Sequence, residues 1–167
     1  LYELISPVLH TVSIGTVGIG QAKLQYSFAV KDKIEMYKLA NFDFQANDFR
    51  IDSVSETQRG FWYSRGFSFE ATGIEGLMTA RNHRFTVKRM TLDTESGDFN
   101  LERIRLYPLS VCGQNDYMAG SIDTVGIRGL LYDKGISARL LKIDRPNLRY
   151  VLVSSFNKKD VKSVKPA

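Results

Sequence analysis

The chain alternates apolar and polar residues with a period of two along most of its length. The clearest runs have apolar side chains at Phe42, Phe44 and Ala46; Phe67, Phe69 and Ala71; Phe85 and Val87; Phe99 and Leu101; Ile104 and Leu106; and Leu148, Tyr150 and Leu152. Because successive side chains of a β-strand point to opposite faces of a sheet, each run predicts a strand with one apolar and one polar face. Turn-forming sequences at 95–98, 112–116, 132–135 and 144–147 separate the runs.

Connections this short join antiparallel neighbours, since a parallel crossover needs about a dozen residues or more. We therefore expect an all-β fold, an antiparallel meander of about eight to ten strands that forms a curved sheet, a groove or an incomplete barrel. The concave face is predicted to be lined by Phe42, Phe44, Phe67, Phe69, Phe85, Val87, Ile104 and Leu106. These side chains either face lipid and shield acyl chains, or pack as an ordinary core.

A glycine cluster, Gly15, Gly18 and Gly20, invites comparison with phosphate-binding loops. Such a loop needs a helix N-terminus behind it, and no helical pattern follows. Six of seven residues are instead shared between Ser13–Ile19 and Ser121–Ile127. We interpret residues 13–26 and 121–132 as two related strand units, each with a glycine against which another segment packs closely.

Length and charge set the domain organisation. The 167 residues suffice for one core without a metal or disulfide, and Cys112 is the only cysteine. We expect a single β domain over 1–155, followed by a lysine-rich polar linker or tail over 156–167. The first residue is Leu1 rather than Met, so the domain is expected to come from a longer protein, with any anchor outside this segment. The net charge of +5 favours contact with acidic surfaces, whether nucleic acid, anionic lipid or polysaccharide, although the charges alternate with core residues as on a solvated strand face.

No motif predicts a reaction, a cofactor or a metal. His10, His83 and Cys112 lack the spacing of a zinc site, and the acidic run from Asp93 to Asp98 lacks a complete calcium loop. The "RGFSF" sequence at 65–69 resembles part of an RNA-recognition motif, but the two helices of that domain have no counterpart. We expect a non-enzymatic domain with no cofactor and no nucleic-acid partner.

The order of strand patterns between Thr11 and Ser155 resembles segments of AsmA-like proteins of the bacterial cell envelope. The resemblance rests on blocks such as "VSIGTVGIGQAKLQY", "FTVKRMTLDTESGDFNLERIRLYPL" and "GSIDTVGIRGLLYDKGISARLLKIDRPNLRY". It implies an elongated β groove in the periplasm or cell envelope, membrane association, neighbouring domains of the same chain, and a role in lipid transport or outer-membrane maintenance. It supplies no site residues. Asp123 and Arg128 make the second strand unit more polar than the first.

Two other classes of function stay open. A cell-surface β-sandwich that binds carbohydrate or protein would display exposed aromatic residues, and Phe61, Trp62 and Tyr63 are the candidates. An enzyme whose acid and base come from distant strands is the third reading. The oligomeric state is not predicted.

Overall fold

The structure is a computed structural model that describes residues 2–5, 7–53, 64–110, 116–132 and 136–152. Its regular structure is almost entirely β, which confirms the predicted all-β class. The helical parts are α1 (Tyr2–Ile5) and the single turn η2 (Thr79–Arg81). The strands are β1 (Val12–Val30), β2 (Lys33–Ile51), β3 (Gly66–Met78), β4 (His83–Asp93), β5 (Asp98–Pro108), β6 (Tyr117–Arg128), β7 (Leu131–Tyr132), β8 (Ile136–Ser137), β9 (Leu140–Asp144) and β10 (Asn147–Val151).

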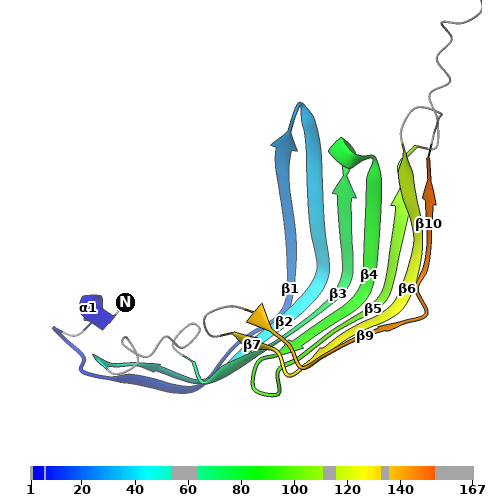
Figure 1. The fold of residues 1–167 in the computed structure, drawn as a ribbon. Helices are drawn as coiled ribbons and strands as arrows, with labels where there is room; N and C mark the ends of the chain where they lie inside the picture. Colours follow the sequence, from blue (N-terminus) through cyan, green and yellow to red (C-terminus); the bar gives the residue numbers. More distant parts are fainter. Residues whose placement is uncertain (1, 6, 54–63, 111–115, 133–135, 153–167) are drawn as a thin grey trace, which may run out of the picture.

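The main sheet is an antiparallel meander, as predicted. Its strands lie in the order β1-β2-β3-β4-β5-β6-β10, with β9 also paired to β6, while β7 and β8 form a separate two-stranded ribbon. The sheet is open: β1 and the β9–β10 edge lie at opposite sides of it (Figure 1). Among the described residues no second sheet of comparable size packs on it, so the described strands form one layer apart from the short β7–β8 ribbon.

The turn expected at residues 144–147 is not a hairpin. β9 and β10 both pair with β6, and the pairing of Asp144 with Thr124 continues in one register to Asn147 and Ser121. The two strands are therefore one edge strand that is interrupted at Arg145 and Pro146. Proline has no N–H to donate to a ladder, which explains why the interruption falls there.

The apolar alternation shifts by one residue along every long strand. In β4 the apolar positions run through Phe85 and Val87 and resume at Met90, after a step of three residues. The same step occurs from Ile19 to Ala22 in β1, Leu39 to Phe42 in β2, Ala71 to Ile74 in β3, Leu101 to Ile104 in β5, Ile122 to Val125 in β6, and Ile143 to Pro146 between β9 and β10. These steps lie side by side from β2 to the β9–β10 edge. Within them, Thr72 of β3 pairs with Arg89 of β4, and Arg89 pairs with Glu102 of β5.

The backbone is distorted at the shift. Gly73, Arg103 and Arg145 have φ angles of 60°, 52° and 47°, whereas Lys88 and Asp123, which occupy this position in the intervening strands, have no positive φ. Two consecutive side chains then point to the same surface, which makes that surface longer and bends the strand, as at a β-bulge. Figure 1 shows the long strands bending between an upright part and a lower part.

Side-chain exposure shows which surface is the inner one. Lys88 and Arg103 are exposed at the bend. Apolar residues on either side of the shift are buried, with Ala71 0% and Val87 7% exposed. The polar rows therefore lie on the outside of the bend, and the apolar rows of both parts lie on its inside. The fully covered side chains are small; no large side chain is fully buried among the described residues.

The two strand units both cross a bend, but they differ from the prediction in two ways. Tyr26 lies within β1, whereas β6 ends at Arg128 and Tyr132 belongs to β7. No segment packs closely on the glycines: an added Cβ would lie 3.4 Å from the Phe44 carbonyl oxygen at Gly18 and 3.7 Å from the Asn100 side chain at Gly126. Both glycines lie on the polar surface of an uncovered sheet, where space is available.

Candidate binding face

The inner surface of the sheet carries continuous rows of apolar side chains, one residue from each strand. The cross-strand pairs that make up the most complete row are Ile19–Phe44, Phe44–Phe69, Phe69–Leu92, Leu92–Phe99, Phe99–Ile127 and Ile127–Leu141. The next row runs through Ala22, Phe42, Ala71, Met90, Leu101, Val125 and Ile143. Neither row is interrupted by a polar residue. We call this surface the apolar face.

Beyond the bend the apolar face continues in two further rows. One runs through Leu24, Leu39, Ile74, Val87, Ile104 and Ile122, and the other through Tyr26, Tyr37, Gly76, Phe85, Leu106, Gly120 and Leu148. All eight residues predicted to share a face lie on these rows or on the short row Val17–Ala46–Phe67. Seven of them are half-buried and Val87 is buried. This placement shows that they share a face, and it is independent of whether they contact lipid or pack as a core.

Aromatic rings form one cluster on each side of the bend. On one side the ring centroids of Phe42 and Phe69 are 5.8 Å apart, as are those of Phe44 and Phe67. On the other side Tyr37 lies 5.9 Å from Phe28 and 6.1 Å from Phe85. These separations fall in the range of favourable aromatic pairs. The clusters give the face rigid, flat surfaces without a covering layer.

One acidic group lies on the apolar face. Glu35 is buried, and its carboxylate accepts a hydrogen bond of 3.3 Å from the Tyr37 hydroxyl. Burial, followed by the charge and hydrogen bond of Glu35, raises the pKa of Tyr37 above its ordinary value of 10.0. The phenol is therefore neutral at physiological pH and acts as a donor to the carboxylate.

The predicted set covered only part of the face. Met90, Leu92, Val125 and Ile127 lie on the same rows but were not among the eight. The sequence feature that identifies these residues is the step of three residues between Val87 and Met90, which repeats in every long strand. If the apolar residues of a strand are assumed to alternate strictly, the apolar residues of its two halves are assigned to opposite faces.

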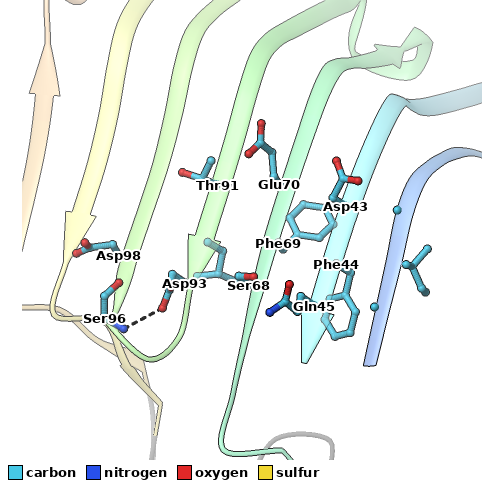
Figure 2. A pocket seen from close by; sticks show the side chains of 14 residues that line it. Asp43, Phe44, Gln45, Ser68, Phe69, Glu70, Thr91, Asp93, Ser96 and Asp98 are labelled. Carbon is cyan, nitrogen blue, oxygen red and sulfur yellow. Dashed lines mark hydrogen bonds between the residues drawn. The ribbon is translucent and has the colours of Figure 1, made fainter. Parts of the chain in front are cut away.

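The opposite surface is polar. A depression of about 650 Å³ lies on it, around Asp43, Glu70, Asp93 and Asp98. Figure 2 shows these side chains. Three of these carboxylates already have protein partners. Glu70 pairs with Arg89 at 2.9 Å, Asp43 accepts the Gln21 amide at 2.9 Å, and Asp93 accepts the amides of two turn residues, Glu95 and Ser96. The depression is therefore a polar surface in which Glu70 is neutralised by an ion pair and Asp43 and Asp93 are held by backbone amides.

The residues considered as metal ligands do not come together. The Nδ1 of His83 lies 2.5 Å from the Arg81 carbonyl oxygen, and its Nε2 accepts the Met118 amide at 3.0 Å, so both ring nitrogens are engaged by backbone. Cys112 lies outside the described residues, as do Phe61, Trp62, Tyr63 and the tail at 156–167. Within the described residues no group of three or more His, Cys, Asp or Glu side chains could hold a metal ion.

None of the helices in the described part of the chain has the length and apolar character needed to cross a membrane. Comparison with known proteins gave no match to a family model, to a curated protein or to a solved structure.

Proposed function

We propose that the chain is a non-enzymatic lipid-binding domain whose apolar face holds acyl chains. The observation that carries this proposal is the apolar face, on which no second sheet packs among the described residues and in which two apolar rows cross the sheet from β2 to β9 without a polar interruption. Monomeric proteins rarely expose a large contiguous apolar surface, and such a surface marks a place where another molecule binds. An acyl chain has no polar groups to satisfy, so the two rows through Phe69 and Ala71, which contain no hydrogen-bonding side chain, suit it.

The shape of the face supports the same occupant. A row from β2 to β9 crosses five strand spacings, about 24 Å at about 4.8 Å each. The bend brings the rows of the two parts toward one another on the inner side, where Ala71 and Val87 are buried. An extended chain lying on the inner side would contact side chains of both parts.

The setting proposed for this function follows the resemblance to AsmA-like segments. We propose that the domain is part of a larger, membrane-associated protein of the periplasm or cell envelope that takes part in lipid transport or outer-membrane maintenance. The alternative, a carbohydrate- or protein-binding β-sandwich, depended on Phe61, Trp62 and Tyr63, which lie outside the described residues. The described sheet has one layer, so nothing in it favours the sandwich.

Two adjacent leucines at the sheet edge allow a matched test. Leu141 pairs with Ile127 on the apolar face, whereas Leu140 pairs with Arg128 on the opposite surface. Both are well exposed, at 58% and 48%, so neither is needed for a core. Leu141→Glu is expected to weaken binding of a fluorescent acyl-chain-labelled phospholipid at least several-fold, and Leu140→Glu to leave it unchanged. Equal binding by both variants and the wild type would refute the proposal.

A further inference from the structure

The two edges of the main sheet differ in how they are protected. The β9–β10 edge is interrupted at Arg145 and Pro146 and carries further charges at Lys142 and Arg149. Interruption, proline and charge are the usual means of preventing an edge strand from pairing with another chain. The β1 edge contains no charged residue and no proline over Val12–Ala22, and its pairing with β2 continues on both sides of the register shift between Ile19 and Ala22. Within the described residues, β1 pairs with β2 alone.

The apolar positions of β1 are symmetric about Gly18. Val17 and Ile19 flank it at one residue, Ile14 and Ala22 at four, and Val12 and Leu24 at six. A strand with this spacing is complementary to itself when a second copy runs antiparallel with Gly18 facing Gly18. Each of these six apolar residues then faces another of them in the partner, and the apolar faces of the two sheets become continuous.

The bends of β1 are also related by symmetry about Gly18. Gly15 lies opposite Asp48, which has a φ of 50°, and Gln21 has a φ of 54°. In the antiparallel arrangement Gln21 of one copy faces Gly15 of the other. The bend of the main sheet shows this same alternation, in which Gly73 and Arg103 have positive φ while Lys88 between them does not. A second copy would therefore extend the observed pattern of bends instead of breaking it.

We propose that the chain forms a symmetric homodimer through β1, with the two-fold axis at Gly18 and perpendicular to the sheet. The apolar residues nearest to the axis have room for this, because Val17 and Ile19 are 38% and 52% exposed. Gly18 itself is exposed, and an added Cβ would have only the Phe44 carbonyl oxygen nearby, at 3.4 Å. The inference rests on the edge strand and does not depend on lipid binding by the apolar face.

The shared sequence of β1 and β6 supplies a matched pair of variants. Gly18 and Gly126 lie in the same TVGI sequence on the polar surface, but β6 is an interior strand that pairs with β5 and β9. Gly18→Lys would place two ammonium groups opposite each other at the axis, and like charges directly opposite destabilise strand pairing. Gly126→Lys adds the same charge within the sheet, directly opposite Lys142, so it also controls for like-charge repulsion that does not involve the β1 edge.

Analytical ultracentrifugation at micromolar concentration tests the proposal, with circular dichroism to verify folding. The wild type and Gly126→Lys are expected to sediment at twice the mass of one chain and Gly18→Lys at the monomer mass. An equimolar mixture of Gly18→Lys and Gly18→Glu should recover the dimer. A monomeric wild type, or a dimer that persists in Gly18→Lys, would overturn the proposal.

Disulfide formation gives a second test if Gly18→Lys fails to fold. In a Cys112→Ser background, Gly18→Cys places two thiols at facing positions of adjacent strands, where the Cα separation of about 4.5 to 5.5 Å permits a bond. Ser13→Cys is the control, since the two Ser13 residues would lie ten positions apart in register and roughly 33 Å from each other. Oxidation is expected to link Gly18→Cys and not Ser13→Cys. Linkage of both to the same extent, or of neither, would contradict the register.

Discussion

Gly73 of β3 packs against Ala40 of β2 at the bend of the sheet. A Cβ added to Gly73 would lie 2.7 Å from the Ala40 Cβ, and Gly73 has a φ of 60°, which residues with a side chain rarely adopt. Gly73→Ala is therefore expected to destabilise the fold by about 1 to 3 kcal/mol in urea unfolding, from the backbone conformation and the close contact together.

Gly126→Ala is the control for this change, because Gly126 has ordinary strand dihedrals and its nearest side chain, Asn100, is 3.7 Å from the added Cβ. It should change the free energy of unfolding by less than about 0.5 kcal/mol. Similar costs at the two glycines would mean that the bend imposes no special backbone conformation at Gly73.

Arg103 has the same left-handed conformation as Gly73 without being a glycine. Its φ is 52°, and it lies in β5 beside Lys88 of β4, a residue of like charge. Replacing Arg103 with glycine removes the strain of the side chain in this conformation and the repulsion. We expect Arg103→Gly to stabilise the fold by roughly 1 kcal/mol. Lys88→Gly, at a position without positive φ, should instead destabilise the fold by about 0.5 to 1 kcal/mol. A loss of stability in both variants would contradict the left-handed conformation of Arg103.

Two adjacent residues of β3 test which side chains of the strand point to the apolar face and which to the polar surface. Phe69 lies on the apolar face with its ring 5.8 Å from that of Phe42, whereas Glu70 forms an exposed ion pair with Arg89. Because Phe69 is half-buried, Phe69→Ala should cost about 1 to 3 kcal/mol, less than the 3 to 5 of a fully buried phenylalanine. Glu70→Ala should cost well under about 1 kcal/mol. Thermal or urea unfolding that gave the reverse order would place the apolar face on the other side.

The raised pKa of Tyr37 predicts a dependence of stability on alkaline pH. The folded state holds the phenolic proton more tightly than the unfolded state, whose tyrosine titrates near the ordinary value of 10.0. The stabilisation is complete below that pH and is lost as the pH rises through the higher pKa of the folded state. Tyr37→Phe should flatten this part of the stability curve, measured by urea unfolding between neutral pH and pH values above 10.0. An identical slope in the variant would exclude Tyr37 as its source.

Much of the fold followed from the alternation of apolar residues, and the missing part has a specific cause. Period-two runs such as Phe67–Phe69–Ala71 and short turns predicted an antiparallel meander, which the structure confirms. The pattern did not predict that Val87 and Met90 point to the same surface, because that depends on a left-handed residue in neighbouring strands. The break at Arg145 was read as a turn for the same reason: a local pattern does not distinguish a hairpin from one interrupted strand.

The identity of residues between the strand units was also only partly informative. It indicated that Ser13–Ile19 and Ser121–Ile127 are strands, but it did not reveal that one is an unpaired edge and the other an interior strand. Pairing partners are set by the order of strands in the sheet, which a shared heptapeptide does not encode. The predicted face was incomplete for a related reason, since several of its residues, including Leu92 and Ile127, become neighbours of Phe69 and Phe99 only through that order.

Photocrosslinking with a phospholipid that carries a diazirine in its acyl chain tests the proposed function most directly. After irradiation and peptide mapping, labels are expected on the rows that contain Phe69 and Leu101 on one side of the bend and on the row that contains Val87 on the other. The labels should be lost in Leu141→Glu but not in Leu140→Glu. Labels distributed equally over the apolar face and the surface of Glu70 and Thr91, or no labels at all, would contradict the conclusion that the apolar face binds acyl chains.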